Sequence, residues 1–195
     1  MKLNKILGLA AIAALALMAF ASVASATTLE TNGEKKEVAV TIEATASSTV
    51  TLESTSGVFS NTCSTSTVKG TTTVFTGPTV SGSVKKEDLS FSNCTHSPVV
   101  NNSASTLSVE RIGITTNGTV RSSGASVTTP VTVFGEVVST TCTTSNTDIG
   151  TLNGSSTPGK STITLNAILT CGGVLPSARW TGTYTITGHG IGVGA

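Results

Sequence analysis

The sequence predicts an all-β protein: a single β-sandwich or barrel-like domain stapled by two disulfides. Three observations predict this fold. Many short segments alternate apolar and polar residues, 38 of the residues are threonine, and four cysteines are spread along the chain. Threonine is β-branched and fits a pleated strand better than a helix. Beyond the first 26 residues, no window repeats its apolar residues with the 3.6-residue period of a helix.

The first 26 residues have the pattern of a bacterial secretory signal peptide. Lys2 and Lys5 precede an apolar run over residues 6–20, and the small residues Ala24-Ser25-Ala26 follow it. This order is typical of a segment that is removed after export. The run is also shorter than the roughly 20 residues that span a bilayer. We therefore expect a secreted protein, extracellular or at the cell surface, with no transmembrane segment in the mature chain.

The mature chain is predicted to begin with a polar leader, residues 27–37, followed by the β-domain over residues 38–187. The first alternating segment of that domain, 38–44, predicts a strand with Val38, Val40 and Ile42 on one face. These three residues form a candidate assembly strand that could pair with another copy of the chain. Residues 49–53 are expected to be the hairpin partner of this strand.

Further alternating or β-rich segments follow, separated by Gly, Pro, Ser and Asn. Asn117-Gly118 is a dipeptide typical of a two-residue hairpin turn. In the last segment, Trp180, Tyr184 and Ile186 share one face, and threonines occupy the other. The Gly-rich tail, residues 188–195, is expected to be frayed or weakly paired. The predicted strands are 70–76, 79–84, 89–92, 107–114, 120–122, 131–141, 162–167 and 180–186.

The four cysteines predict two structural disulfides in an oxidising compartment. Cys63, Cys94, Cys142 and Cys171 allow three pairings. Their spacing favours Cys63–Cys94 and Cys142–Cys171, which close loops of similar length. Because no C-x-x-C occurs and both histidines are remote from any cysteine pair, we expect neither a metal nor a cofactor.

The net charge and the sequence motifs argue against nucleic-acid binding and against enzymatic activity. Without the signal peptide, nine basic and ten acidic residues leave a net charge of −1, so we expect no nucleic-acid partner. The stretch 154–161 matches a phosphate-binding loop, but a strand pattern follows it where a helix is required. His96, Glu136 and Asp148 are isolated candidates for acid–base chemistry. We therefore expect no catalytic residues and no enzymatic activity.

Several stretches carry a resemblance to known proteins: Cys63-Ser-Thr-Ser-Thr-Val-Lys-Gly, Leu89-Ser-Phe-Ser-Asn-Cys-Thr, Thr147-Asp-Ile-Gly-Thr-Leu and Trp180-Thr-Gly-Thr-Tyr-Thr-Ile-Thr. With them, the chain resembles a group of uncharacterised secreted Thr/Ser-rich bacterial β-proteins. More distantly, it is similar to bacterial surface proteins described as alkane-oxidation activators, which are associated with biofilm and adhesion. The resemblance implies a role at the cell surface and transfers no catalytic residue.

Two functions follow as expectations. The first is a secreted, non-enzymatic surface or extracellular-matrix protein that acts in adhesion, self-assembly or biofilm, with itself or other surface components as partners. The second is a secreted binding module or carrier that holds a small apolar ligand inside its β-structure.

Overall fold

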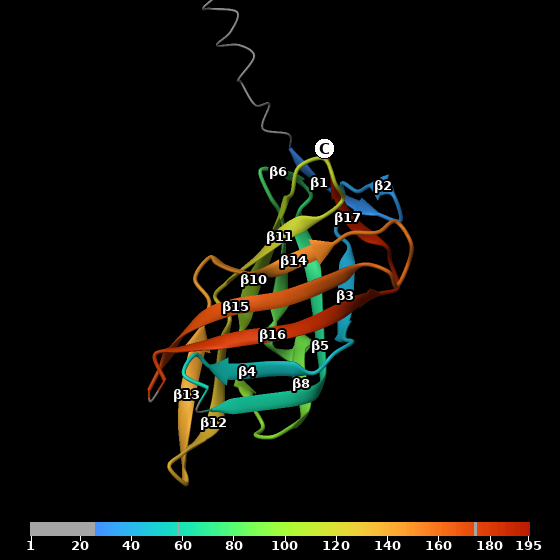
Figure 1. Ribbon diagram of the computed structural model, residues 1–195. Helices are drawn as coiled ribbons and strands as arrows, with labels where there is room; N and C mark the ends of the chain where they lie inside the picture. Colours follow the sequence, from blue (N-terminus) through green and yellow to red (C-terminus); the bar gives the residue numbers. More distant parts are fainter. Residues whose placement is uncertain (1–25, 58, 174) are drawn as a thin grey trace, which may run out of the picture.

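The computed structural model describes residues 26–57, 59–173 and 175–195 (Figure 1). The predicted signal peptide lies outside the described residues except for Ala26. Within them, the regular structure is β-strand apart from the 3₁₀ helix η1 (Lys86–Asp88), and no helix is long and apolar enough to cross a membrane. The strands are β1 (Thr27–Thr31), β2 (Glu34–Lys35), β3 (Thr41–Ala46), β4 (Val50–Ser54), β5 (Ser60–Val74), β6 (Thr76–Gly77), β7 (Val80–Lys85), β8 (Leu89–Cys94), β9 (Val99–Val100), β10 (Ala104–Arg111), β11 (Gly118–Ser123), β12 (Ser126–Val133), β13 (Glu136–Thr143), β14 (Thr147–Asn153), β15 (Thr162–Gly172), β16 (Ser177–Thr187) and β17 (Ile191–Gly194).

Eight of these strands form a closed antiparallel barrel, which confirms the all-β prediction. Around the wall the order is β5, β7, β10, β11, β14, β15, β16 and β3, and β3 pairs with β5 to close the circuit. Strand β4 continues beyond the end of β3 and lies between the same two neighbours, β16 and β5. Closure leaves the wall without a free edge, because each of the eight strands is paired on both sides.

Two barrel strands extend past the wall and carry the outer strands. Near its start β5 pairs with β4 and β8, and the end of β15 pairs with β13. We call the first group, β4, β8 and the start of β5, the β8 arm. The second group, β9, β12, β13 and the end of β15, is the β13 arm. In Figure 1 strands β12 and β13 lie at the end of the molecule opposite β1 and β17.

Each arm is joined to its barrel strand by one disulfide. Cys63 on β5 is directly opposite Cys94 on β8, and Cys142 on β13 is directly opposite Cys171 on β15. The structure has both bonds, so the pairing favoured by the spacing is confirmed. All four cysteines are in these bonds.

A small second sheet closes the other end of the barrel. Strand β1 pairs with β17, β2 and β6, and we call this sheet the plug. Leu29, Ile191 and Val193 are buried beneath it, at 1–3% exposure. The expectation of a frayed Gly-rich tail is therefore wrong, and the polar leader begins with a buried strand. Glycine alternates with Ile and Val in the tail, and a Cβ at Gly190 would collide with the backbone of Ser156.

The candidate assembly strand is not a free strand. Val38 is 66% exposed and precedes β3. The amide of Val40 donates to Thr72 Oγ1 at 2.8 Å, and Ile42 lies in the barrel wall between β16 and β5. The expected hairpin between 38–44 and 49–53 also does not form, because β3 and β4 both pair with β5 instead of with each other.

Candidate binding site

The interior of the barrel contains three apolar cavities. The inner cavity, about 100 Å³, lies beneath the plug and is bounded there by Leu29, Ile191 and Val193. The central cavity, about 60 Å³, lies against Tyr184 and Leu165. The outer cavity, about 80 Å³, lies between the two arms, where Cys63 and Cys142 both line it. Each is several times larger than the roughly 10–15 Å³ that one water molecule needs.

The three cavities adjoin one another along the barrel. Five residues line both the inner and the central cavity: Val68, Val84, Leu107, Val120 and Ile163. Three residues, Leu89, Ala125 and Trp180, line both the central and the outer cavity. Shared walls of this kind mean that the cavities form one row from the plug to the arms.

Side chains that face the interior do not fill it. Leu107, Val109 and Ile163 pack against the apolar core yet are only half-buried. The neighbouring strands contribute glycines to the same cavity: Gly82 on β7, which pairs directly with Leu107, and Gly70 on β5. An eight-stranded barrel is wide enough either to be filled by large side chains or to hold one small ligand. This chain has few large ones, since aromatic residues make up only 4% of it.

A hydrogen-bond chain links β16 to β5 and β8 on one side of the barrel. Tyr184 Oη donates to Ser66 Oγ at 2.8 Å, and Ser66 Oγ donates to the carbonyl of Ser90 at 2.8 Å. Burial raises the pKa of Tyr184 to about 12, although the hydrogen bond with Ser66 acts in the opposite direction. The phenol therefore stays neutral at physiological pH, and its polar end has a partner.

The polar groups of the outer cavity are also paired with one another. Asn61 Nδ2 donates to Thr129 Oγ1 at 2.6 Å and to the carbonyl of His96 at 2.8 Å. Its Oδ1 accepts from the His96 amide at 3.1 Å. Thr144 Oγ1 lies 3.0 Å from Ser122 Oγ. Among the residues that the structure describes, no charged side chain lines any of the three cavities.

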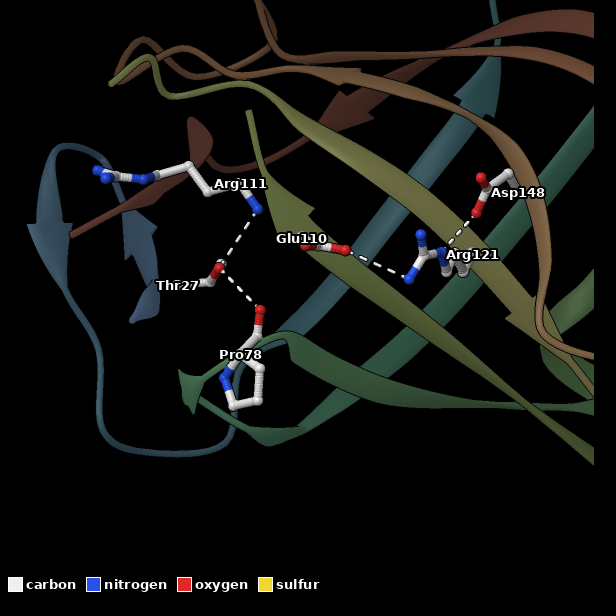
Figure 2. A network of polar contacts seen from close by, with 6 residues as sticks. All are labelled: Thr27, Pro78, Glu110, Arg111, Arg121 and Asp148. Atoms are coloured by element: carbon white, nitrogen blue, oxygen red, sulfur yellow. Dashed lines mark hydrogen bonds and ion pairs between the residues drawn. The ribbon is translucent and has the colours of Figure 1, made fainter. Parts of the chain in front are cut away.

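Three charged side chains that the structure brings together, Arg121, Asp148 and Glu110, lie on the outer wall (Figure 2). Arg121 on β11 donates through Nε to Asp148 Oδ1 at 2.5 Å and pairs with Glu110 Oε2 at 3.2 Å. The hydrogen bond and charge of Asp148 raise the pKa of Arg121. Since these groups are solvent-exposed, they contribute little stability. They link β10, β11 and β14 across the outer face.

Figure 2 also shows how the plug is attached to the barrel. The hydroxyl of Thr27 donates to the carbonyl of Pro78 at 3.1 Å and accepts from the amide of Arg111 at 3.3 Å. Thr27 is fully buried. This threonine therefore fixes the start of β1 to two neighbouring parts of the chain.

The isolated acid–base candidates do not converge. Asp148 pairs with Arg121, Glu136 is exposed at the start of β13, and His96 contacts Asn61 through its backbone. The stretch 154–161 connects β14 to β15 without a helix. Within the described ranges, no cluster of His, Cys, Asp and Glu could hold a metal ion.

The sequence predicts the cysteines of the site, and an interior ligand site is one of its two expected functions, but the sequence does not predict which residues line the cavities. Tyr184 belongs to the core and Trp180 packs against it, as the sequence predicts, and both also line the central cavity. Comparison with protein-family models, with curated proteins and with solved structures finds no match to this chain. The resemblance to secreted Thr/Ser-rich bacterial proteins therefore stays a prediction.

Proposed function

We propose that this chain is an exported, non-enzymatic protein that binds a small apolar ligand inside its barrel. One observation carries the proposal: the cavities adjoin one another in a row, and several apolar side chains that line them, including Leu107, Val109 and Ile163, are only half-buried although they face inward. An apolar ligand in such a row restores the dispersion contacts that an empty cavity lacks. Two disulfides and hydroxyl-bearing outer strand faces are consistent with a protein that works outside the cytoplasm.

The test uses the neutral fluorescent probe N-phenyl-1-naphthylamine, whose emission rises in apolar surroundings. We compare the disulfide-bonded protein with Leu107→Phe, which adds volume between the inner and central cavities. The matched control is Thr106→Phe, which places the same side chain on the exposed face of β10.

We expect the unchanged protein and Thr106→Phe to bind the probe equally, and Leu107→Phe to bind it at least about tenfold more weakly. Because Leu107 is half-buried beside open space, the added ring should fill a void, and the variant should keep or raise its melting temperature. Equal binding by all three proteins, or by none, is the outcome that rejects an interior site.

Adhesion or self-association is the second candidate, and the β12–β13 hairpin favours it. Phe134 and Val137 at its tip are 99% and 67% exposed. Apolar side chains gathered on a protruding tip are typical of a contact site. The barrel wall itself offers no edge for strand addition, and association through this tip would join a second copy of the chain.

Sedimentation velocity tests this second candidate. Phe134→Ser should abolish concentration-dependent association, whereas Ile114→Ser, which removes another fully exposed apolar side chain, should leave it unchanged. If the protein without substitutions stays monomeric at all concentrations, self-association through the tip is rejected.

A further inference from the structure

We infer that the ligand is an elongated aliphatic molecule without charge, which lies along the barrel axis with one end beneath the plug. This inference rests on the proposed function, since it specifies which apolar molecule the barrel binds. Three features of the site lead to it: the row of cavities is long, it is closed at one end, and its walls are almost wholly apolar and carry no charged side chain.

The length of the row follows from the strand that runs beside it. Cys63 lines the outer cavity and Thr71, further along β5, lines the inner cavity. At a rise of about 3.3 Å per residue they are separated by about 26 Å along the strand, or about 20 Å along the axis for a tilt of roughly 40°. A compact ligand would occupy one cavity, whereas a chain can contact all three.

The plug determines which end is closed. Leu29 from β1 and Ile191 and Val193 from β17 line the inner cavity and are themselves buried. Backbone pairing between β1 and β17 holds them in place. A ligand therefore enters from the side of the arms, and the end that enters first meets only aliphatic groups beneath the plug.

The absence of charge follows from the walls. Buried Tyr184, Asn61 and Thr129 already have hydrogen-bond partners within the protein. Two buried side-chain atoms of the described residues have no partner, Thr31 Oγ1 and His189 Nδ1, and neither residue lines a cavity. A carboxylate or ammonium group on a chain that fills the row would lose its water shell with nothing to replace it. The site therefore discriminates against charged chain molecules.

The fluorescence of Trp180 reports the position of the bound aliphatic ligand. Trp180 is the only tryptophan of the protein and lines both the central and the outer cavity. Bromine quenches tryptophan emission on contact. A bromine near the middle of a bound chain should lie beside Trp180, whereas one at the terminal carbon should lie in the inner cavity, beyond contact.

The experiment measures Trp180 emission with tetradecan-1-ol, tetradecanoate and tetradecyl-ammonium at neutral pH, and with alcohols brominated at mid-chain or at the terminal carbon. We expect the alcohol to bind at least about tenfold more tightly than either ion. Mid-chain bromine should quench Trp180 strongly and terminal bromine weakly. Leu107→Phe should remove the quenching, and Thr106→Phe should retain it.

The outcomes separate this inference from the proposed function. Equal affinity for the alcohol and both ions, or equal quenching by the two brominated alcohols, overturns the inference, while binding of N-phenyl-1-naphthylamine that Leu107→Phe weakens would still support an interior site. If neither the probe nor any chain molecule binds, both proposals are rejected.

Discussion

The plug can be tested quantitatively. The sequence pattern predicted that β1 and β17 lie outside the folded domain, whereas the structure buries them. Leu29 on β1 is 2% exposed and lies against Ile191 and Val193. Leu→Ala substitutions at buried sites cost roughly 2–5 kcal/mol, and the cost grows with the volume that stays empty. Since Leu29 already borders the inner cavity, its neighbours have little reason to collapse into the new space. We expect Leu29→Ala to lower the free energy of unfolding by about 3–4 kcal/mol.

Urea denaturation of the disulfide-bonded protein measures this loss. The control is Ile114→Ala, since Ile114 is 96% exposed and its truncation should change the free energy of unfolding by less than about 0.5 kcal/mol. If Leu29→Ala has as small an effect as Ile114→Ala, then β1 does not pack under the plug and the description of the closed end is wrong.

Three further predictions follow from buried groups. Folding raises the pKa of Tyr184 from about 10 to about 12. The contribution of the neutral phenol to the free energy of unfolding is therefore fully present below pH 10. About 3 kcal/mol of this free energy is lost as the pH rises through 12. Tyrosinate absorbance reports this residue alone, because the chain has one tyrosine, and Tyr184→Phe should remove the loss. Replacing Cys63 and Cys94 together by alanine should cost about 4 kcal/mol in urea denaturation, as expected for a bond that closes a loop of 31 residues; an unchanged midpoint would contradict the chain-entropy account. Gly150→Ala should unfold at a temperature several degrees lower, because its Cβ would collide with the backbone of Thr164; an unchanged melting temperature would show that the strands can separate there.

Local alternation predicted the strands that lie in the barrel wall. The segment 180–186 was expected to place Trp180, Tyr184 and Ile186 on one buried face, and all three belong to the core or pack against it within β16. Alternation succeeds here because each barrel strand has one face toward the apolar interior and one toward water. Outside the wall, the predicted segment 89–92 also lies within its strand, β8.

Turns were predicted less well. Asn117-Gly118 was expected to form a two-residue hairpin turn, yet Gly118 already pairs with Arg111 as the first residue of β11. Asn32-Gly33 makes that turn instead, with φ of 55° and 82°, between β1 and β2. The same dipeptide thus has two outcomes, because strand pairing determines which residues remain in the loop.

The predicted strand 131–141 is in fact two strands. Phe134 and Gly135 form a two-residue turn, with φ of 51° and 85°, between β12 and β13. Phenylalanine is rare at positive φ, so the residue type concealed the turn. Gly135 was the only local sign of it.

Long-range pairing explains what the sequence could not predict. Thr28 pairs with Gly194, and no local pattern connects residues so far apart. The cavities have the same origin, since their size depends on how many strands close the barrel and in which register. A low aromatic content was the available signal, because it limits how well a wide interior can be filled.

The most direct test of the central claim is a crystal structure of the disulfide-bonded protein under xenon pressure. Empty apolar cavities bind xenon, whereas a close-packed interior does not. We predict xenon inside the barrel, in contact with Leu107, Ile163 and Trp180. An interior without xenon, with these side chains packed against one another, would contradict the proposal that the barrel is built to hold an apolar ligand.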